Sequence, residues 1–188
     1  FLSSPFSRKA GDMLYKLGVP AWKIPSGEVN NFHLLEIMAN TGLPILLSSG
    51  MSSLEELDST VKFCRDKNAD IAVFQCTTAY PCPPEKIGLN LLQEFKQRYN
   101  CPVGLSDHSS KIFSGFAAAA QGASLLEVHV TFSKKMFGPD VSSSLDFKEF
   151  SQLVEGVRYI ETMNSNPIVK NMMAQEIGPL RKMFTKSI

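Results

Sequence analysis

Two histidines follow successive apolar segments of the sequence, and their placement suits one shared site. His108 comes just after Pro102–Ser106, and His129 lies near the end of Leu125–Val130. If these segments are neighbouring parallel strands, the two imidazoles meet at the same edge of the sheet. Two imidazoles with open coordination positions suit a catalytic metal that also holds substrate and water, and Asp107 could be a further ligand or orient a histidine. For either histidine alone, a simple hydrogen-bonding role is the alternative.

A lysine and three serines at segment ends point to an anionic ligand. Lys23 lies within a predicted strand, where its charge is costly to bury unless it meets an anion. Ser26, Ser48 and Ser106 each stand where a strand should end, and their hydroxyls can donate to phosphate oxygens. Ordinary turn chemistry explains each serine singly. Together with the lysine and the histidine pair they predict a phosphorylated substrate.

Three further residues at the same level could contact a polyhydroxylated substrate. Glu28 and Asp140 can orient hydroxyl groups or move a proton, although capping a helix or a solvated charge is the alternative for each. Tyr80 precedes the turn Pro81-Cys82-Pro83-Pro84, which can hold its ring rigidly over the mouth of a site. These residues complete the set of candidates at the strand ends.

The elements that position these residues recur as a short apolar strand, a turn and an amphipathic helix. Strands are predicted at Phe1–Ser4, Ala21–Pro25, Pro44–Ser48, Ile71–Cys76, Pro102–Ser106 and Leu125–Val130. Helices are predicted between them, among others at 53–67 and Phe113–Ala120, and a last one from near Asp146. Ser52 with Glu55, or Ser53 with Glu56, offers a capping box at the start of the helix 53–67.

About six consecutive β/α units predict an α/β fold, either an open doubly wound sheet or a barrel. In both architectures ligands bind at the carboxyl ends of the strands, which is where the candidate residues lie. Ser165-Asn166-Pro167 should end the last helix. We therefore expect a domain over residues 1–164, followed by a linker or docking arm over 165–188.

The composition excludes several classes of protein. Over 188 residues, 19 Lys and Arg balance 18 Asp and Glu, so the clearly basic surface of a nucleic-acid binder is not expected. No apolar run is long enough to span a membrane, and no signal peptide is visible. Four cysteines without a Cys-x-x-Cys pair indicate reduced thiols, which favours a cytoplasmic protein.

Six motifs occur in an order that resembles one known family. They are Lys-Ile-Pro-Ser-Gly-Glu (23–28), Leu-Ser-Ser-Gly-Met (47–51), Gln-Cys-Thr-Thr-Ala-Tyr-Pro (75–81), Gly-Leu-Ser-Asp-His (104–108), Glu-Val-His-Val-Thr (127–131) and Gly-Pro-Asp (138–140). In combination they resemble the sialic acid synthases, the N-acetylneuraminate synthase family that condenses phosphoenolpyruvate with an amino sugar. The resemblance implies a TIM-type (β/α)8 barrel of which this chain carries about six units. Two more units would precede residue 1, and an antifreeze-like (SAF) domain would follow residue 188.

The resemblance also implies an activity and residue roles. The family is a transferase class that joins phosphoenolpyruvate to N-acetylmannosamine or a related N-acetylated sugar, and its full-length members form homodimers. His108 and His129 match its ligands for Mn²⁺ or Mg²⁺, although imidazoles by themselves suit zinc, iron or copper better. The residues that match phosphoenolpyruvate contacts are Lys23, Ser26, Ser48 and Ser106. Those that match positions around the sugar are Glu28, Tyr80 and Asp140. Thr78 stands where some members have an asparagine that contacts phosphoenolpyruvate.

The acceptor sugar stays open at this point. The Ser-Asp-His motif at 106–108 resembles bacterial members and favours an unphosphorylated sugar, since animal members tend to have glycine in place of Asp107. A legionaminate, pseudaminate or spore-coat nonulosonate synthase would share the metal and phosphoenolpyruvate residues. A non-catalytic barrel scaffold is the alternative of another class, but it would need none of the charged residues at the strand ends.

Overall fold

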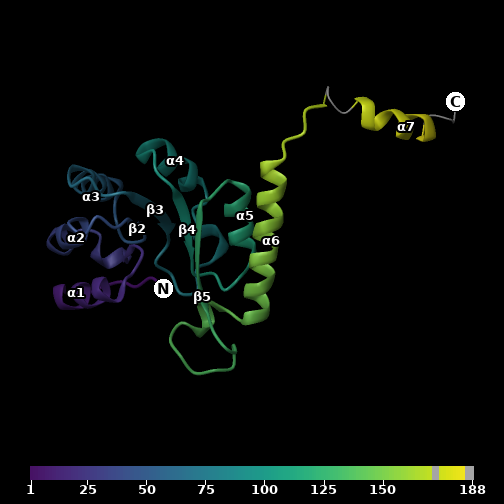
Figure 1. Ribbon diagram of the computed structural model, residues 1–188. Helices are drawn as coiled ribbons and strands as arrows, with labels where there is room; N and C mark the ends of the chain where they lie inside the picture. Colours follow the sequence, from purple (N-terminus) through teal and green to yellow (C-terminus); the bar gives the residue numbers. More distant parts are fainter. Residues whose placement is uncertain (171–173, 185–188) are drawn as a thin grey trace.

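The computed structural model describes residues 1–170 and 174–184 and is built around a sheet of six parallel strands. The strands lie in chain order, and each pairs with the strand before it (Figure 1). They are β1 (Trp22–Ile24), β2 (Ile45–Ser48), β3 (Ile71–Cys76), β4 (Val103–Asp107), β5 (Leu125–Val130) and β6 (Ser144–Leu145). The helices are α1 (Arg8–Leu17), α2 (Phe32–Ala39), α3 (Leu54–Asp66), α4 (Asn90–Tyr99), α5 (Phe113–Ala120), α6 (Phe147–Ser165) and α7 (Ala174–Phe184), and 3-10 turns lie at η1 (Ser26–Glu28), η2 (Pro84–Lys86) and η3 (Val141–Ser143).

The hydrophobic core lies between the outer face of this sheet and the helices that cover it. Ile45 and Val73 of the strands pack in one cluster with Leu35 and Met38 of α2 and Leu92 of α4, and all five side chains are fully buried. Burying one such side chain contributes about 1.5–3 kcal/mol to stability. This layer holds the strands in register and leaves their other face free to line a curled half-barrel.

Capping boxes fix where two helices begin. At α3 the Ser53 hydroxyl accepts from the Glu56 backbone N–H, and the Glu56 carboxylate accepts from the Ser53 N–H. Asp146 and Glu149 form the same arrangement at α6. Both predicted helix starts are therefore confirmed, and the second of the two alternatives for α3 is the one that forms.

Strand alternation gives the sheet an inner face that is apolar at its centre and polar at its carboxyl end. Phe74, Gly104 and Leu125 lie in one row across β3, β4 and β5, and Cys76, Ser106 and Glu127 lie in the next row. Gly104 is required here because an added Cβ would lie 2.6 Å from the Leu125 carbonyl oxygen. The close approach of β4 and β5 at this row brings the polar row above it together.

Two strand predictions need correction. The segment Phe1–Ser4 contributes only an isolated bridge between Ser3 and Trp22, and Pro5, which has no N–H to donate, follows directly. A strand at Ser144–Leu145 was not predicted, because two residues are too short to show alternation. It pairs with His129 and Val130 of β5.

The carboxyl-terminal part of the chain follows the prediction only in part. Helix α6 ends at Ser165, as the Ser165-Asn166-Pro167 sequence indicated. Beyond it the segment 165–188, which was expected as a linker or docking arm, contains helix α7, drawn apart from the sheet in Figure 1. Residues 171–173 and 185–188 of that segment lie outside the described residues. None of the described helices is both long and apolar enough to cross a membrane.

Candidate functional site

The carboxyl ends of the strands bring the predicted lysine and two of the predicted serines into one network. The Lys23 ammonium lies 2.6 Å from Ser48 Oγ and 3.1 Å from Glu127 Oε1. Ser106 Oγ donates to the same Glu127 oxygen at 2.7 Å. The ammonium also lies over the ring of Phe74, 5.3 Å from its centroid. Lys23 of β1 and Ser106 of β4 thus converge on one carboxylate of β5, and Ser48 of β2 joins the network through Lys23.

Lys23, Phe74 and Glu127 of this network line a groove of about 470 Å³. The Lys23 side chain is only 13% exposed, whereas that of Glu127 is 41% exposed. A half-buried ammonium needs an anion beside it, and Glu127 supplies one. The anion that Lys23 meets in the structure is a carboxylate of the chain itself, and its contact with a phosphorylated ligand stays a prediction.

Ser26 and Thr78 meet in a second cluster around Gly50. The Gly50 N–H donates to Ser26 Oγ at 3.0 Å, and Ser26 Oγ donates to Cys76 Sγ at 3.6 Å. A Cβ added at Gly50 would lie 2.7 Å from both Ser26 Oγ and Thr78 Oγ1 and 2.9 Å from Cys76 Sγ. Only glycine leaves room for these hydroxyl groups. The cluster presents a backbone N–H, two hydroxyls and a thiol between the ends of β1, β2 and β3.

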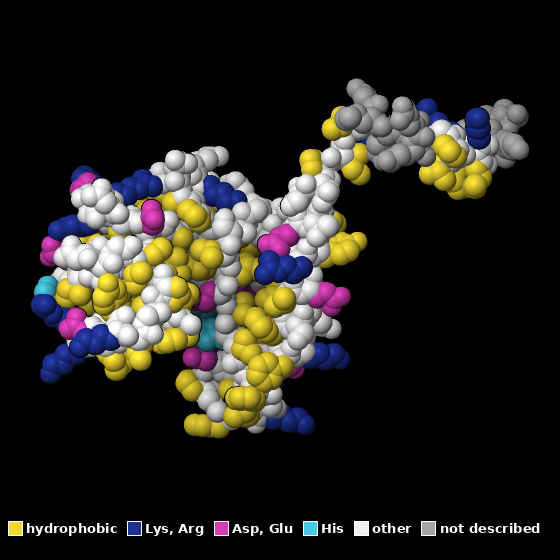
Figure 2. All heavy atoms as spheres, viewed as in Figure 1, with side chains coloured by type: hydrophobic (Ala, Val, Ile, Leu, Met, Phe, Trp, Pro, Cys, Tyr) yellow, Lys and Arg dark blue, Asp and Glu magenta, His cyan; other side chains and the backbone are white. Residues whose placement is uncertain are grey.

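The two histidines face each other, and Tyr80 packs against both. The ring centroids of His108 and His129 are 5.2 Å apart. The Tyr80 ring stacks on His108 at 4.2 Å and meets His129 edge-on at 5.7 Å. Its hydroxyl lies 3.3 Å from His108 Nε2. On this face of the molecule, histidine and acidic side chains share a hollow (Figure 2).

The surroundings of His108 fix its tautomer and its charge. His108 Nδ1 lies 3.0 Å from the Thr77 carbonyl oxygen, which can only accept, so Nδ1 carries the proton and Nε2 keeps its lone pair. Burial lowers the pKa of His108 below its ordinary value, which keeps the imidazole neutral near pH 7. Burial likewise raises the pKa of Tyr80, so its hydroxyl stays protonated.

This arrangement fits a divalent metal held by two imidazoles. Metal-binding histidines typically donate the N–H of the other ring nitrogen to a carbonyl or carboxylate, as His108 does to Thr77. No group of three or more His, Cys, Asp or Glu side chains that could hold a metal occurs among the residues that the structure describes. His108 and His129 are the residues that would hold a metal here, and its other coordination positions would be open to substrate and water.

Of the two carboxylates predicted to contact the sugar, Asp140 lies beside the histidine pair and Glu28 does not. Asp140 Oδ2 lies 3.9 Å from His129 Nδ1, so this residue belongs to the histidine cluster. Glu28 lies in η1 and accepts a hydrogen bond from Asn31 Nδ2 at 2.7 Å. No hydrogen bond found within residues 1–170 and 174–184 joins Glu28 to either histidine.

Asp107 points away from the site. It follows Ser106 on β4, so its side chain lies on the opposite face of the strand, where Oδ2 accepts from Ser109 Oγ at 2.7 Å. Its Oδ1 atom is buried without a hydrogen-bond partner. This placement does not support Asp107 as a metal ligand or as a hydrogen-bond partner of His108. Asp107 packs beneath the turn that carries His108.

Glu127 and Cys76 have no role in the sequence prediction, yet both touch predicted site residues. The missing signal is strand alternation. Side chains two residues apart on a strand point to the same face of the sheet. Glu127 lies two residues before His129 on β5, and Cys76, the last residue of β3, lies two before Thr78. Applying that period to the predicted strands would have found both.

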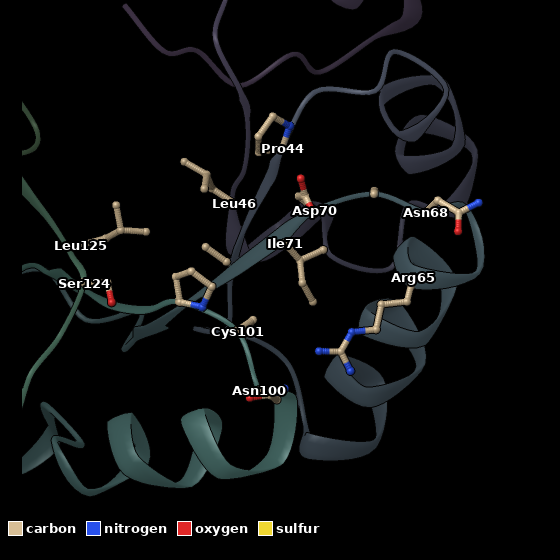
Figure 3. A pocket seen from close by; sticks show the side chains of 13 residues that line it. Pro44, Leu46, Arg65, Asn68, Asp70, Ile71, Asn100, Cys101, Ser124 and Leu125 are labelled. Carbon is tan, nitrogen blue, oxygen red and sulfur yellow. The ribbon is translucent and has the colours of Figure 1, made fainter.

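A separate cavity of about 730 Å³ lies at the amino ends of the strands (Figure 3). Leu46, Ile71 and Leu125 give it a largely apolar lining, with Arg65 and Asp70 among its polar residues. None of the predicted site residues lines it. The chemistry-bearing side chains are at the other end of the sheet, where ligands of parallel α/β proteins bind.

The parallel half-barrel, with a lysine–serine network and a histidine pair at its carboxyl end, defines an α/β protein of the barrel type. Residues 1–168 match the NeuB family, and the chain belongs to that family. An uncharacterized protein of Methanocaldococcus jannaschii is 40% identical over 87% of this chain and 49% of its own length.

Named relatives include synthases for different sugars. The N,N'-diacetyllegionaminic acid synthase of Campylobacter jejuni is 36% identical over 94% of this chain and 54% of its own length. The human N-acetylneuraminate-9-phosphate synthase is also 36% identical, over 89% of this chain and 47% of its own length. The chain thus spans about half the length of the curated relatives it matches. The crystal structure of an N-acetylneuraminic acid synthetase from Leptospira borgpetersenii superimposes with a TM-score of 0.85 at 30% identity, covering 98% of this chain and 65% of that one.

Proposed function

We propose that the native protein condenses phosphoenolpyruvate with the open-chain aldehyde of N-acetylmannosamine, giving N-acetylneuraminate and phosphate. Membership of the NeuB family supports this reaction class. The observation that carries the proposal is the joining of Lys23, Ser48 and Ser106 in one network at the end of the sheet that also holds the facing His108 and His129. An anion site and a metal-binding pair at the same strand ends are what this condensation requires.

The metal in this proposal is Mn²⁺ or Mg²⁺, held by His108 and His129. When bound, it supplies Lewis-acid polarisation of the sugar aldehyde. The chain's own contribution is to keep His108 neutral, through burial, and to orient it, through the Thr77 carbonyl. Tyr80 packs against both rings and restricts their rotation.

Phosphoenolpyruvate is held by its anionic groups. Lys23 with Ser48 and Ser106 is proposed as one set of donors, and the Ser26 hydroxyl, which the Gly50 N–H holds in place, as another. The enol carbon attacks the aldehyde carbon, and the aldehyde oxygen takes up a proton to become a hydroxyl. The new carbon–carbon bond leaves positive charge on the carbon that bears phosphate, and water adds to that carbon and loses one proton. Loss of the second proton forms the keto group as the carbon–oxygen bond to phosphate breaks, and phosphate leaves with the bonding electrons. The products are a 2-keto acid and inorganic phosphate.

The sugar is proposed to bind beside the histidine pair. In this proposal Asp140 accepts hydrogen bonds from its hydroxyl groups and Tyr80 donates to them; both residues lie close to His129. Glu28 is proposed to position the sugar and manage a proton, released from the contact with Asn31 that it makes in the structure. Thr78 presents its hydroxyl beside Ser26.

The parent protein is proposed to be a cytoplasmic homodimer of complete (β/α)8 barrels. Residues 1–164 would form most of the barrel, and 165–188 would lead to an antifreeze-like domain. In this proposal the fragment alone is inactive, because barrel strands that complete the site are missing. The curated relatives, about twice as long as the chain's match to them, support a longer parent.

A 2,4-diacetamido sugar is the second candidate acceptor. The legionaminate synthase of Campylobacter jejuni and the human N-acetylneuraminate-9-phosphate synthase are both 36% identical to the chain, so similarity favours neither sugar. Asp107 had favoured an unphosphorylated sugar, but it packs against Ser109, outside the site. It therefore cannot select the sugar by contact.

The test is a phosphate-release assay on the full-length protein with phosphoenolpyruvate, Mn²⁺ and a panel of 2-acetamido sugars. Release with N-acetylmannosamine supports sialate synthesis, and release only with a 2,4-diacetamido sugar moves the assignment to a legionaminate or pseudaminate synthase. Release only with N-acetylmannosamine 6-phosphate would assign the protein to the type that uses a phosphorylated sugar. No release with any sugar would favour the non-catalytic scaffold.

A further inference from the structure

Glu127 occupies the donors that the proposed function gives to substrate phosphate. One of its oxygens, Oε1, lies 3.1 Å from Lys23 Nζ and accepts from Ser106 Oγ at 2.7 Å. The same ammonium donates to Ser48 Oγ. Ammonium and hydroxyl donors arranged around one point suit a tetrahedral phosphate as well as they suit a carboxylate oxygen.

The two partners of this ion pair are not equally fixed. Lys23 is 13% exposed and is held from two more sides by Ser48 and by the ring of Phe74. Glu127 is 41% exposed and lines the groove. The carboxylate can therefore turn toward solvent while the ammonium stays in place. Because Lys23 would otherwise be a largely buried charge without a counter-ion, the pair also stabilises the folded chain.

We propose that Glu127 is a displaceable internal anion that holds Lys23 and Ser106 in their binding positions until the phosphate group of the substrate takes its place. This inference rests on the proposed function, because it takes Lys23 and Ser106 as phosphate contacts. Glu127 is a positioning residue: it prepares the donors and reduces affinity for phosphate by competing with it. Its removal should therefore strengthen phosphate binding, whereas loss of a merely structural residue would weaken it.

The experiment is calorimetric titration of the native protein with inorganic phosphate and with phosphoenolpyruvate. Glu127→Gln keeps an acceptor of the same size for Lys23 and Ser106 but removes the charge. We expect it to bind both ligands about tenfold more tightly than the wild type. Glu155→Gln, at an exposed position on α6, is the matched control for the change in net charge and should bind as the wild type does.

Unchanged or weaker binding by a folded Glu127→Gln variant would overturn the inference. If that variant does not fold, Glu127→Asp replaces it: the shorter carboxylate cannot reach both partners, so tighter binding is again expected and wild-type affinity overturns the inference. The variant Lys23→Ala distinguishes failure of this inference from failure of the proposed phosphate site. Weaker phosphate binding in Lys23→Ala without a gain in the Glu127 variants refutes only this inference, whereas unchanged binding in Lys23→Ala refutes the proposed phosphate site as well.

Discussion

Gly50 offers the sharpest local test of the site, because a single methyl group there acts on two predicted substrate contacts at once. In Gly50→Ala the new Cβ would lie 2.7 Å from Ser26 Oγ and Thr78 Oγ1, whereas ordinary contact begins at 3.4 Å, so each hydroxyl has to move by about 0.7 Å. All three crowded atoms belong to side chains, and Gly50 does not have a positive φ. The substitution should therefore displace the hydroxyls without straining the backbone.

The expected effect falls on binding and turnover rather than on folding. Losing a well-placed hydrogen bond to a charged ligand costs about 1.5–3 kcal/mol, and a displacement of about 1 Å can cost 100-fold in rate. We expect Gly50→Ala to lower kcat/KM for phosphoenolpyruvate by about 10- to 100-fold. Stability should fall by less than about 1 kcal/mol, below the usual range for overpacking a rigid core.

Gly27→Ala is the matched control, since Gly27 is next to Ser26 and an added Cβ there meets nothing within 4 Å. Steady-state phosphate release at varied phosphoenolpyruvate, together with urea unfolding, compares the two variants in the full-length protein. Equal kcat/KM in Gly50→Ala and Gly27→Ala would refute a binding role for the Ser26 and Thr78 hydroxyls. A large loss of stability in Gly50→Ala would refute the claim that the crowded side chains move without straining the backbone.

Three further predictions follow from the same geometry. Lys23→Ala should raise the KM for phosphoenolpyruvate about tenfold or more and that for the sugar far less, as measured by varying each substrate in turn; equal effects would argue against a phosphate contact. Gly104→Ala should lower the free energy of unfolding by about 1–3 kcal/mol in urea titrations, because its Cβ would meet the Leu125 backbone at 2.6 Å, and a neutral result would contradict the packing of β4 against β5. Burial lowers the pKa of His108 in the folded protein below its ordinary value of 6.5. As pH falls, His108 is therefore protonated in the unfolded chain before it is protonated in the folded protein. The free energy of unfolding should thus decrease as pH falls from 6.5 through the pKa of His108 in the folded protein. Unfolding curves of His108→Gln should show a smaller drop over the same range, and an identical pH dependence would show that His108 is not the group responsible.

Much of the fold could be predicted from local signals in the sequence. The strands at Ile71–Cys76 and Leu125–Val130 match to the residue, because a buried or alternating apolar run bounded by turns has few other interpretations. The helix starts at Ser53 and Asp146 follow from capping chemistry within four residues. By contrast β6 exists only because His129 and Val130 offer it a paired edge, which is a tertiary effect.

The sequence predicted where in the fold the candidate site lies, but not which of its side chains contact one another. The rule that ligands bind at the carboxyl ends of strands found Lys23, Ser48, Ser106 and both histidines without any distance. It could not show that Asp107 faces the helices, because a one-residue step along β4 reverses the direction of the side chain. Nor could it find Glu127 as the partner of Lys23, since that pair spans four strand positions of the sheet.

The central claim is that the histidine pair and the lysine network form one metal-dependent condensing site. The most direct test replaces His108 and His129 separately by Ala in the full-length protein and measures Mn²⁺-dependent phosphate release, with thermal unfolding in the absence of metal. The account predicts loss of metal-dependent release in both variants and a nearly unchanged metal-free Tm. Wild-type release in both variants would contradict it.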